Sequence, residues 1–183
     1  MKLIIISSSP NKDGLTAACA AAARDGVVKA GGEVEMVSLN DLHVGMCQAC
    51  DNGWGTCHEH HECQVLDDFQ DLHQRTCAAD GLVLVTPVYW GEMSESAKAF
   101  TDRLRRCEAT RDDESALRGK PVLAVAAAGG SGGGMITCLA SMERWIQHVR
   151  ARTFDLLPVN RWSRQYKLET IRAAAEALAL ELK

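Results

Sequence analysis

Short apolar runs alternate along this chain with longer segments in which apolar residues recur at helical spacing. The first run, Leu3-Ile4-Ile5-Ile6, has no polar interruption, which is typical of a parallel strand buried on both faces. We expect strands at residues 2–6, 33–39, 81–86, 121–127 and 153–159. We expect helices at 15–29, from Asp67 or Asp68 to 78, from Ser94 to a charged surface connection at 108–119, at 135–149 and at 168–182.

The alternation of strand and helix predicts an α/β fold with a parallel sheet between two layers of helices. Five strands at this spacing favour the flavodoxin-like order 2-1-3-4-5. Residues 40–64 have no clear period and are rich in glycine, cysteine and histidine. Long loops are usually functional. We therefore expect one domain, residues 1–183, with a cysteine-rich loop insertion at 43–64.

Composition and charge narrow the possible partners. The chain has 183 residues, 46% of them hydrophobic, which is enough for one full core. Its formal net charge of -4 argues against nucleic acid as a partner. The N-terminal apolar run is too short for a signal-peptide core, and no run is long enough to span a membrane. We expect a cytoplasmic protein.

Three loops carry the candidate chemistry, and each follows a predicted strand. They are the hydroxyl-rich loop 7–16, the aromatic loop 86–91 and the glycine-rich loop 128–134. Ligands of open parallel sheets bind at the carboxyl ends of strands, and a helix N-terminus binds anions. A phosphate-binding loop beside an aromatic loop and a close-approaching glycine loop predicts bound flavin mononucleotide (FMN). The candidate cofactor-binding residues are Ser9, Asn11, Gly14, Leu15, Thr16, Pro87, Val88, Tyr89, Trp90, Gly91, Gly129, Gly130, Gly132 and Gly133.

Each loop also has a plainer interpretation. The first could be a capped turn between strand and helix, and Tyr89 and Trp90 could cap the core. The glycine loop contains a G-x-S-x-G pattern around Ser131, which is typical of a hydrolase nucleophile. The only histidine after Ser131 is His148, and it precedes Asp155, so the order of a hydrolase triad is wrong. We identify no obligatory catalytic acid or base in the sequence.

Eight cysteines are many for a protein expected in a reducing compartment, where clustered cysteines bind metal or do redox chemistry. Four of them, Cys47, Cys50, Cys57 and Cys63, lie within 17 residues. The other four lie in predicted helices, where free cysteine is a small buried hydrophobe. These are Cys19, Cys77, Cys107 and Cys138.

The motifs together resemble the NADPH-dependent FMN reductase family. Residues 9–16 resemble its S-P-R-x-x-G-N-T phosphate loop, with Asn11 in place of arginine and Leu15 in place of asparagine. Residues 86–90 and 129–134 resemble its second and third loops. The resemblance covers nearly the whole chain and implies a flavodoxin-like fold, noncovalent FMN and assembly as a homodimer or homotetramer.

Within that family, the cysteine loop resembles the C-x2-C-x2-C-x5-C loop of iron-sulfur flavoproteins. Cys47 and Cys50 match its first pair and Cys63 its last position, while Gly53 stands at the third. Cys57 could replace that third ligand after a small insertion, which would complete a site for a [4Fe–4S] cluster. Two alternatives stay open, namely zinc on these cysteines, with a loop histidine as substitute ligand, and redox-active thiols without metal.

The sequence therefore predicts an FMN-dependent oxidoreductase. Its donor would be NAD(P)H or reduced ferredoxin, and its acceptor a small molecule such as a quinone, a flavin or oxygen. The alternative is a noncatalytic electron carrier or a redox or metal sensor that uses the cysteine loop.

Overall fold

The computed structural model describes all residues, 1–183. A five-stranded parallel sheet forms the centre of the protein. Its order is β2-β1-β3-β5-β6, which confirms the predicted arrangement of the five long strands. The two-residue strand β4 pairs antiparallel with the end of β3. The fourth and fifth strands of the predicted order are therefore numbered β5 and β6. The strands are β1 (Lys2–Ser7), β2 (Glu33–Ser38), β3 (Gly81–Tyr89), β4 (Glu92–Met93), β5 (Pro121–Ala128) and β6 (Arg152–Asn160).

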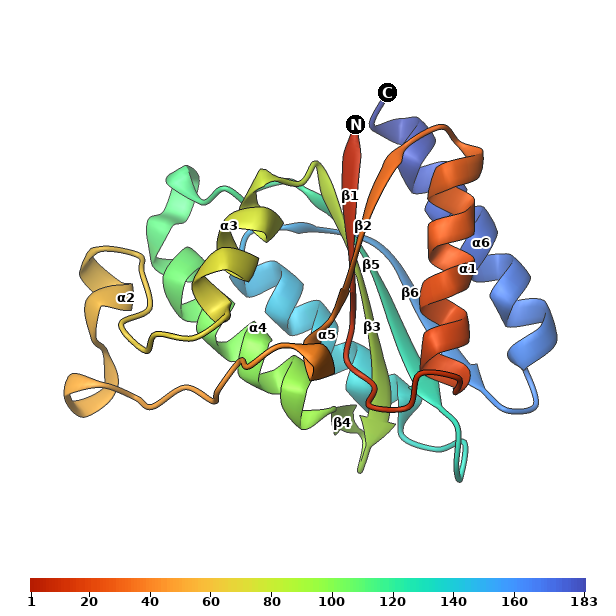
Figure 1. Cartoon of the computed structure of the whole chain (residues 1–183), viewed down its shortest axis with the longest axis horizontal. Coiled ribbons are helices and arrows are strands. Elements are labelled where there is room, and N and C mark those ends of the chain that lie inside the picture. Colours follow the sequence, from red (N-terminus) through yellow and green to blue (C-terminus); the bar gives the residue numbers. More distant parts are fainter.

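Helices cover both faces of the sheet (Figure 1). Helices α1 (Leu15–Lys29) and α6 (Arg164–Glu181) pack on one face. Helices α3 (Phe69–Ala78), α4 (Glu95–Glu108) and α5 (Met135–His148) pack on the other. Alternate residues of each strand point to opposite faces of the sheet. Leu3 and Ile5 therefore pack in the core beneath α1 and α6, and Ile4 and Ile6 pack in the core beneath α3, α4 and α5.

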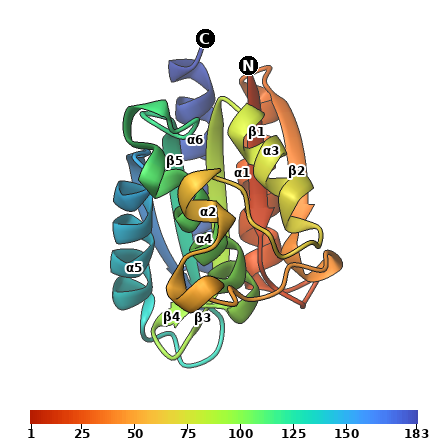
Figure 2. The same cartoon turned by 90° about the vertical axis from the view of Figure 1, so that its left-hand side faces the viewer.

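The cysteine-rich segment forms an extra layer outside the helices (Figure 2). It contains the one-turn helix α2 (Thr56–Glu59) and a short 3₁₀ turn at Asp51–Gly53, and a further 3₁₀ turn, Leu39–Asp41, precedes it. Another 3₁₀ turn, Ala109–Glu114, follows α4. The segment lies against α4, on the face of the sheet opposite α1.

Three sequence expectations need correction. Residues 86–89 are not loop but the end of β3, because the hairpin with β4 prolongs the ladder. Helix α6 begins at Arg164, four residues earlier than predicted. The connection after α4 is not wholly at the surface, because the side chain of Glu108 is fully buried.

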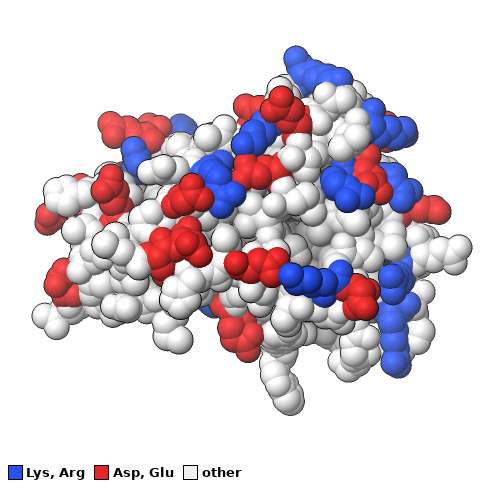
Figure 3. Space-filling model, viewed as in Figure 1, with Lys and Arg blue, Asp and Glu red and all other residues white.

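The surface carries mixed charge. Lysine, arginine and acidic residues are interspersed over the face in Figure 3 and form no large region of one sign. No helix is both long enough and apolar enough to cross a lipid bilayer.

Candidate functional site

The three predicted loops meet at the carboxyl edge of the sheet, at the bottom of Figure 1. Buried hydroxyl groups connect the first two. The Ser94 hydroxyl, at the N-cap of α4, donates to the Ser8 carbonyl at 3.0 Å, and the Ser94 N–H donates to the Thr86 hydroxyl at 3.1 Å. The Ser8 N–H donates to the Val85 carbonyl at 3.1 Å. These bonds fix the ends of β1, β3 and α4 relative to one another.

The loop between β1 and α1 turns tightly around Asn11. The Asn11 N–H donates to the Ser9 hydroxyl at 3.2 Å, and the Asn11 side-chain oxygen accepts from the Asp13 N–H at 3.2 Å. Gly14 is the N-cap of α1 and no side chain caps it, so the first N–H groups of the helix remain available to an anion. Thr16 is buried, whereas Asn11 is exposed.

The second loop is a two-residue hairpin turn between β3 and β4. Trp90 has φ +51° and Gly91 φ +82°, the left-handed backbone that tight hairpins require. The turn places Trp90 wholly in solvent, at 105% exposure, and leaves Tyr89 38% exposed. These aromatic side chains therefore do not cap the core.

The glycine loop packs directly against this hairpin. A side chain at Gly134, which has φ +78°, would come within 2.8 Å of the Gly91 Cα. The Thr137 hydroxyl, in the first turn of α5, donates to the Gly91 carbonyl at 2.9 Å. Between the two loops lies a cavity of about 470 Å³, lined by Val88, Trp90, Gly91, Ser131, Gly133, Gly134 and Thr137.

The G-x-S-x-G pattern is not part of a hydrolase triad. Ser131 is exposed at the start of α5, and His148 is the last residue of that 14-residue helix, about 20 Å away along its axis.

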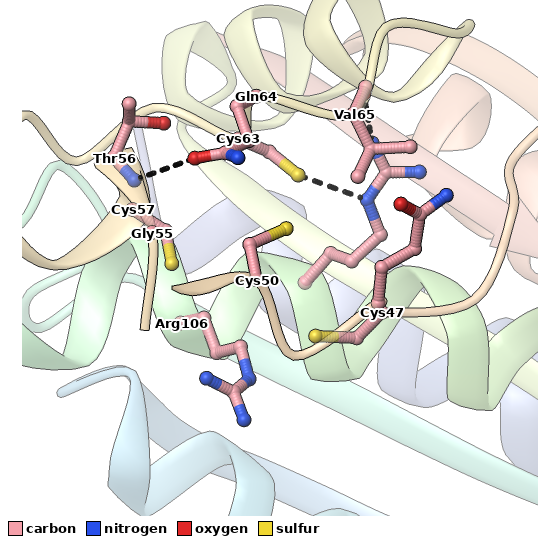
Figure 4. A pocket seen from close by; sticks show the side chains of 11 residues that line it. Cys47, Cys50, Gly55, Thr56, Cys57, Cys63, Gln64, Val65 and Arg106 are labelled. Carbon is pink, nitrogen blue, oxygen red and sulfur yellow. Dashed lines mark hydrogen bonds between the residues drawn. The ribbon is translucent and has the colours of Figure 1, made fainter. Parts of the chain in front are cut away.

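All four clustered cysteines line one pocket (Figure 4), together with Gln48, Gly55, Thr56, Gln64, Val65, Arg103 and Arg106. Their side chains enclose a narrow space of about 20 Å³, room for one or two waters. The structure thus brings together Cys47 and Cys50 before the α2 turn, Cys57 within it and Cys63 after it.

Arg103, a fully buried side chain of α4, organises this pocket. Its Nε donates to the Cys63 sulfur at 3.3 Å, and its Nη atoms donate to the carbonyls of Gly45 at 3.1 Å and Val65 at 2.6 Å. It also forms a 2.6 Å ion pair with the buried carboxylate of Asp67. One guanidinium group thereby holds both ends of the cysteine-rich segment.

Asp67 and Asp68 hold the start of this segment. Asp68 is the N-cap residue of α3, but its side chain does not bond the helix, whereas the Asp67 side chain bonds the first residue of α3. The Asp67 carboxylate accepts from the N–H groups of Gly45 at 2.8 Å and Phe69 at 2.9 Å, and Asp68 accepts from the His43 N–H at 2.6 Å. Burial raises the pKa of Asp67, but hydrogen bonds from Arg103, Gly45 and Phe69 outweigh it and keep this pKa below its usual range.

Comparison with known proteins identifies the family. The family model for NADPH-dependent FMN reductases matches residues 1–156. The chain belongs to the NADPH-dependent FMN reductase family.

Similar curated proteins are iron-sulfur flavoproteins. The chain is 34% identical to one from Methanocaldococcus jannaschii over 57% of its own length, but spans only about half, 52%, of that relative. It is 30% identical to one from Methanosarcina thermophila, covering 80% of this chain and 73% of the relative.

Solved structures show the same fold. A flavone reductase superposes with a TM-score of 0.77 at 19% identity, covering 100% of this chain and 63% of that one. An NAD(P)H:quinone oxidoreductase from Methanothermobacter marburgensis also gives a TM-score of 0.77, at 16% identity, covering 97% and 96% of the two chains.

Six of the predicted site residues of this FMN reductase family member line two hollows, whereas Pro87 is buried and lines neither. Val88, Trp90, Gly91 and Gly133 line the cavity between the hairpin and the glycine loop. Ser9 and Asn11 line a separate hollow of about 310 Å³ beside β2. Gly129 lies beside the start of α1, since a Cβ built there would lie 4.0 Å from the Leu15 Cβ.

Sequence reasoning missed two residues at this edge. Thr137 bonds the hairpin, and the Trp162 ring lies so close to Gly132 that a Cβ there would approach it to 2.3 Å. Trp162 follows β6, the fifth long strand, so its position after a strand end was a usable signal.

The sequence predicts that the cysteine loop leaves β2 at the carboxyl edge of the sheet, but the cysteine pocket lies away from that edge. It lies beside Arg103, nine residues along α4 from Ser94, which corresponds to about 14 Å along the helix axis. Of the scattered cysteines, Cys19, Cys107 and Cys138 are fully buried, as expected, but Cys77 is only partly buried.

Proposed function

We propose that this chain binds FMN at the carboxyl edge of the sheet and a [4Fe–4S] cluster on Cys47, Cys50, Cys57 and Cys63. In this proposal it moves electrons from NAD(P)H or reduced ferredoxin to a small acceptor such as a quinone, a free flavin or oxygen. The observation that carries the proposal is the convergence of all four cysteines on one pocket.

The edge loops have the features that FMN binding requires. The uncapped N-terminus of α1, with Ser9 and Asn11 before it, suits the phosphate. Three of the seven residues that line the cavity beside Val88 are glycines, which let backbone approach a flat ring, and backbone donors near a flavin tune its electronics. Bound FMN supplies both one- and two-electron chemistry, and the chain contributes binding, orientation and partial exclusion of water.

The donor set in the cysteine pocket suits iron and sulfide. Four thiols are soft ligands, and no carboxylate lines the pocket. A single zinc ion with Zn–S bonds of about 2.3 Å needs sulfurs about 3.8 Å apart. No three of these sulfurs lie within 4.8 Å of one another, which favours the larger, multinuclear group. The enclosed space is narrow, so we expect the cysteine side chains to turn outwards on binding.

Positive charge beside the sulfurs supports the same proposal. Arg103 donates to the Cys63 sulfur, and Arg106 lines the pocket while its guanidinium stacks over Trp54 at 4.5 Å. Thiolate ligands and their cluster carry net negative charge, and hydrogen bonds to the sulfurs adjust the reduction potential. Arg103 is therefore a positioning residue for the proposed cluster.

Absorption spectroscopy of the anaerobically purified protein, before and after dithionite, tests the proposal. We expect flavin bands on a broad brown shoulder that bleaches, with about four iron and four sulfide per chain. The variant Cys47→Ser/Cys50→Ser should lose the shoulder and keep the flavin bands, while Cys138→Ser, outside the pocket, should keep both. Flavin bands without a shoulder in the parent protein would contradict the cluster.

Turnover measurements distinguish the proposed enzyme from the alternative, a noncatalytic electron carrier. Steady oxidation of NADPH or NADH with an added quinone supports the enzyme. A bound flavin that only a protein donor can reduce would instead support the noncatalytic carrier. A colourless protein that does not take up added FMN would overturn the whole proposal.

A further inference from the structure

A second group of metal-ligating side chains lies between α3 and the end of α4, outside both the flavin cavity and the cysteine pocket. His73 and Cys77 are one turn apart on α3 and therefore project from the same face. Glu108, the last residue of α4, projects toward them. One nitrogen, one sulfur and one carboxylate oxygen of these three residues lie within 4.8 Å of one another.

The carboxylate of Glu108 is oriented so that one oxygen faces the group. Its Oε2 accepts from the Ser115 hydroxyl at 2.8 Å and from the Ala116 N–H at 3.1 Å. Its Oε1 lies 2.7 Å from His73 Nε2 and 3.6 Å from the Cys77 sulfur. Hydrogen bonds that orient a ligating carboxylate from behind are typical of metal sites.

We propose that His73, Cys77 and Glu108 form a binding site for a single divalent cation, with the ligand preference of Zn²⁺. Imidazole, thiolate and carboxylate are all ligands that zinc uses, and three protein ligands leave a fourth position open. None of these three residues lines the proposed flavin cavity or the cysteine pocket, although Cys63 lines both that pocket and the cavity beside this site.

The spacing is close to that of a zinc site. Tetrahedral bonds of typical length separate a ligating nitrogen and oxygen by about 3.4 Å, and a sulfur and oxygen by about 3.6 Å. The Cys77–Glu108 separation already has the second value. The His73–Glu108 separation of 2.7 Å must lengthen by about 0.7 Å when the metal takes the place of the shared proton.

The fourth position faces solvent. All three ligands line an open cavity of about 450 Å³, and His60 and His61 of the cysteine-rich segment line the same cavity. On binding, the Cys77 thiol would release its proton to solvent, and the Cys77 sulfur, His73 Nε2 and Glu108 Oε1 would bond the metal.

A buried ion pair is the plainer role for two of these residues. It accounts for His73 and Glu108, and for Arg111, whose guanidinium lies 3.9 Å from Oε1. An ion pair alone does not explain why the Cys77 thiol lies on the same helix face as His73, or why an open cavity lies beside the pair. The experiment must therefore detect sulfur bonded to the metal.

Titration with Co²⁺, a spectroscopic substitute for zinc, tests the site in the full chain carrying FMN and the substitutions Cys47→Ser, Cys50→Ser and Cys57→Ser. These changes remove three of the four thiols of the cysteine pocket, so that the result does not depend on a cluster. We expect one cobalt per chain, with an intense sulfur-to-cobalt charge-transfer band. Adding Cys77→Ser should abolish the band, and adding His73→Gln should weaken cobalt binding at least about tenfold.

The exposed His148, at the far end of α5, provides the matched control, because His148→Gln should change neither the band nor the affinity. Circular dichroism establishes that each variant folds. Failure to bind cobalt, a band that survives Cys77→Ser, or unchanged affinity in His73→Gln would each overturn the proposal and leave the ion pair alone.

Discussion

Single buried polar side chains determine how the cysteine-rich segment is held. Arg103 and Asp67 are 1% and 4% exposed, and between them they bond Gly45, Cys63 and Val65. The guanidinium also stacks on Phe69, 4.3 Å from the ring centroid. A planar group with five donors satisfies this set of acceptors, whereas a lysine ammonium does not.

Replacing Arg103 by lysine should therefore loosen the segment although the positive charge remains. We expect Arg103→Lys to lower the free energy of unfolding by about 2 kcal/mol and to reduce the iron content per chain. Urea denaturation and iron analysis measure the two effects. Arg105→Lys on the same helix, outside the pocket, is the control, and equal iron content in both variants would contradict the role of Arg103.

The lowered pKa of Asp67 predicts a specific pH dependence. A carboxylate whose pKa is lower in the folded than in the unfolded state stabilises the fold above its unfolded pKa of about 3.9 and loses that contribution as pH falls through the folded value. The stability difference between the parent protein and Asp67→Asn should be largest above pH 5 and should shrink toward pH 2. Urea denaturation across this range measures it, and a difference independent of pH would contradict the assignment.

At the scale of elements, the hairpin between β3 and β4 shapes the carboxyl edge of the sheet, where we propose that FMN binds. It ends the ladder with a turn whose second residue, Gly91, contacts both Thr137 and Gly134. A side chain at Gly91 would meet the Thr137 hydroxyl at 2.7 Å and would also force an unfavourable left-handed backbone. The cavity between hairpin and glycine loop thus depends on one residue without a side chain.

Gly91→Ala should consequently impair both stability and cofactor binding. We expect a loss of about 1–2 kcal/mol in unfolding free energy from the backbone, and FMN binding weakened at least about tenfold. Gly119→Ala is a matched control, since Gly119 also has positive φ, +71°, but has no atom within 4 Å of its Cβ position. It should lose similar stability and keep its FMN affinity, as measured by flavin fluorescence.

At the scale of the whole molecule, large apolar side chains are exposed around the carboxyl edge of the sheet. Trp90 is 105% exposed, Ile136 at the start of α5 is 70% exposed, and Trp162 after β6 is 66% exposed. Exposed apolar groups that gather in one region mark contact surfaces. We propose that a second copy of the chain covers this edge in a homodimer or homotetramer.

Trp90→Ser should shift that assembly toward the monomer. Light scattering coupled to size-exclusion chromatography measures the mass, and we expect a rise of about tenfold or more in the dissociation constant, because exposed tryptophans are frequent hot spots. Val28→Ser removes an exposed apolar side chain of α1 and should leave the mass unchanged. A parent protein that is monomeric at all concentrations would contradict the proposal.

The fold was predictable from the sequence because its signals are local. The apolar run from Leu3 to Ile6 and the alanine-rich segment from Leu15 to Lys29 have the periods of a buried strand and a helix, and the structure has both elements there. Hydrophobic periodicity does not predict the end of an element where tertiary contacts prolong it. The pairing of Val88 with Met93 turns the predicted loop after residue 86 into strand.

The sequence by itself determined the strand order, the family and the membership of the cysteine group, because the spacing of strands and of cysteines is local and chemically specific. Only the tertiary structure decided which distant residues share a space. It buried Arg103 between both ends of the cysteine-rich segment and brought Glu108 to His73 and Cys77, which lie more than 30 residues earlier. Such contacts depend on the packing of α3 against α4, and packing follows from the shape of the whole core rather than from any local period.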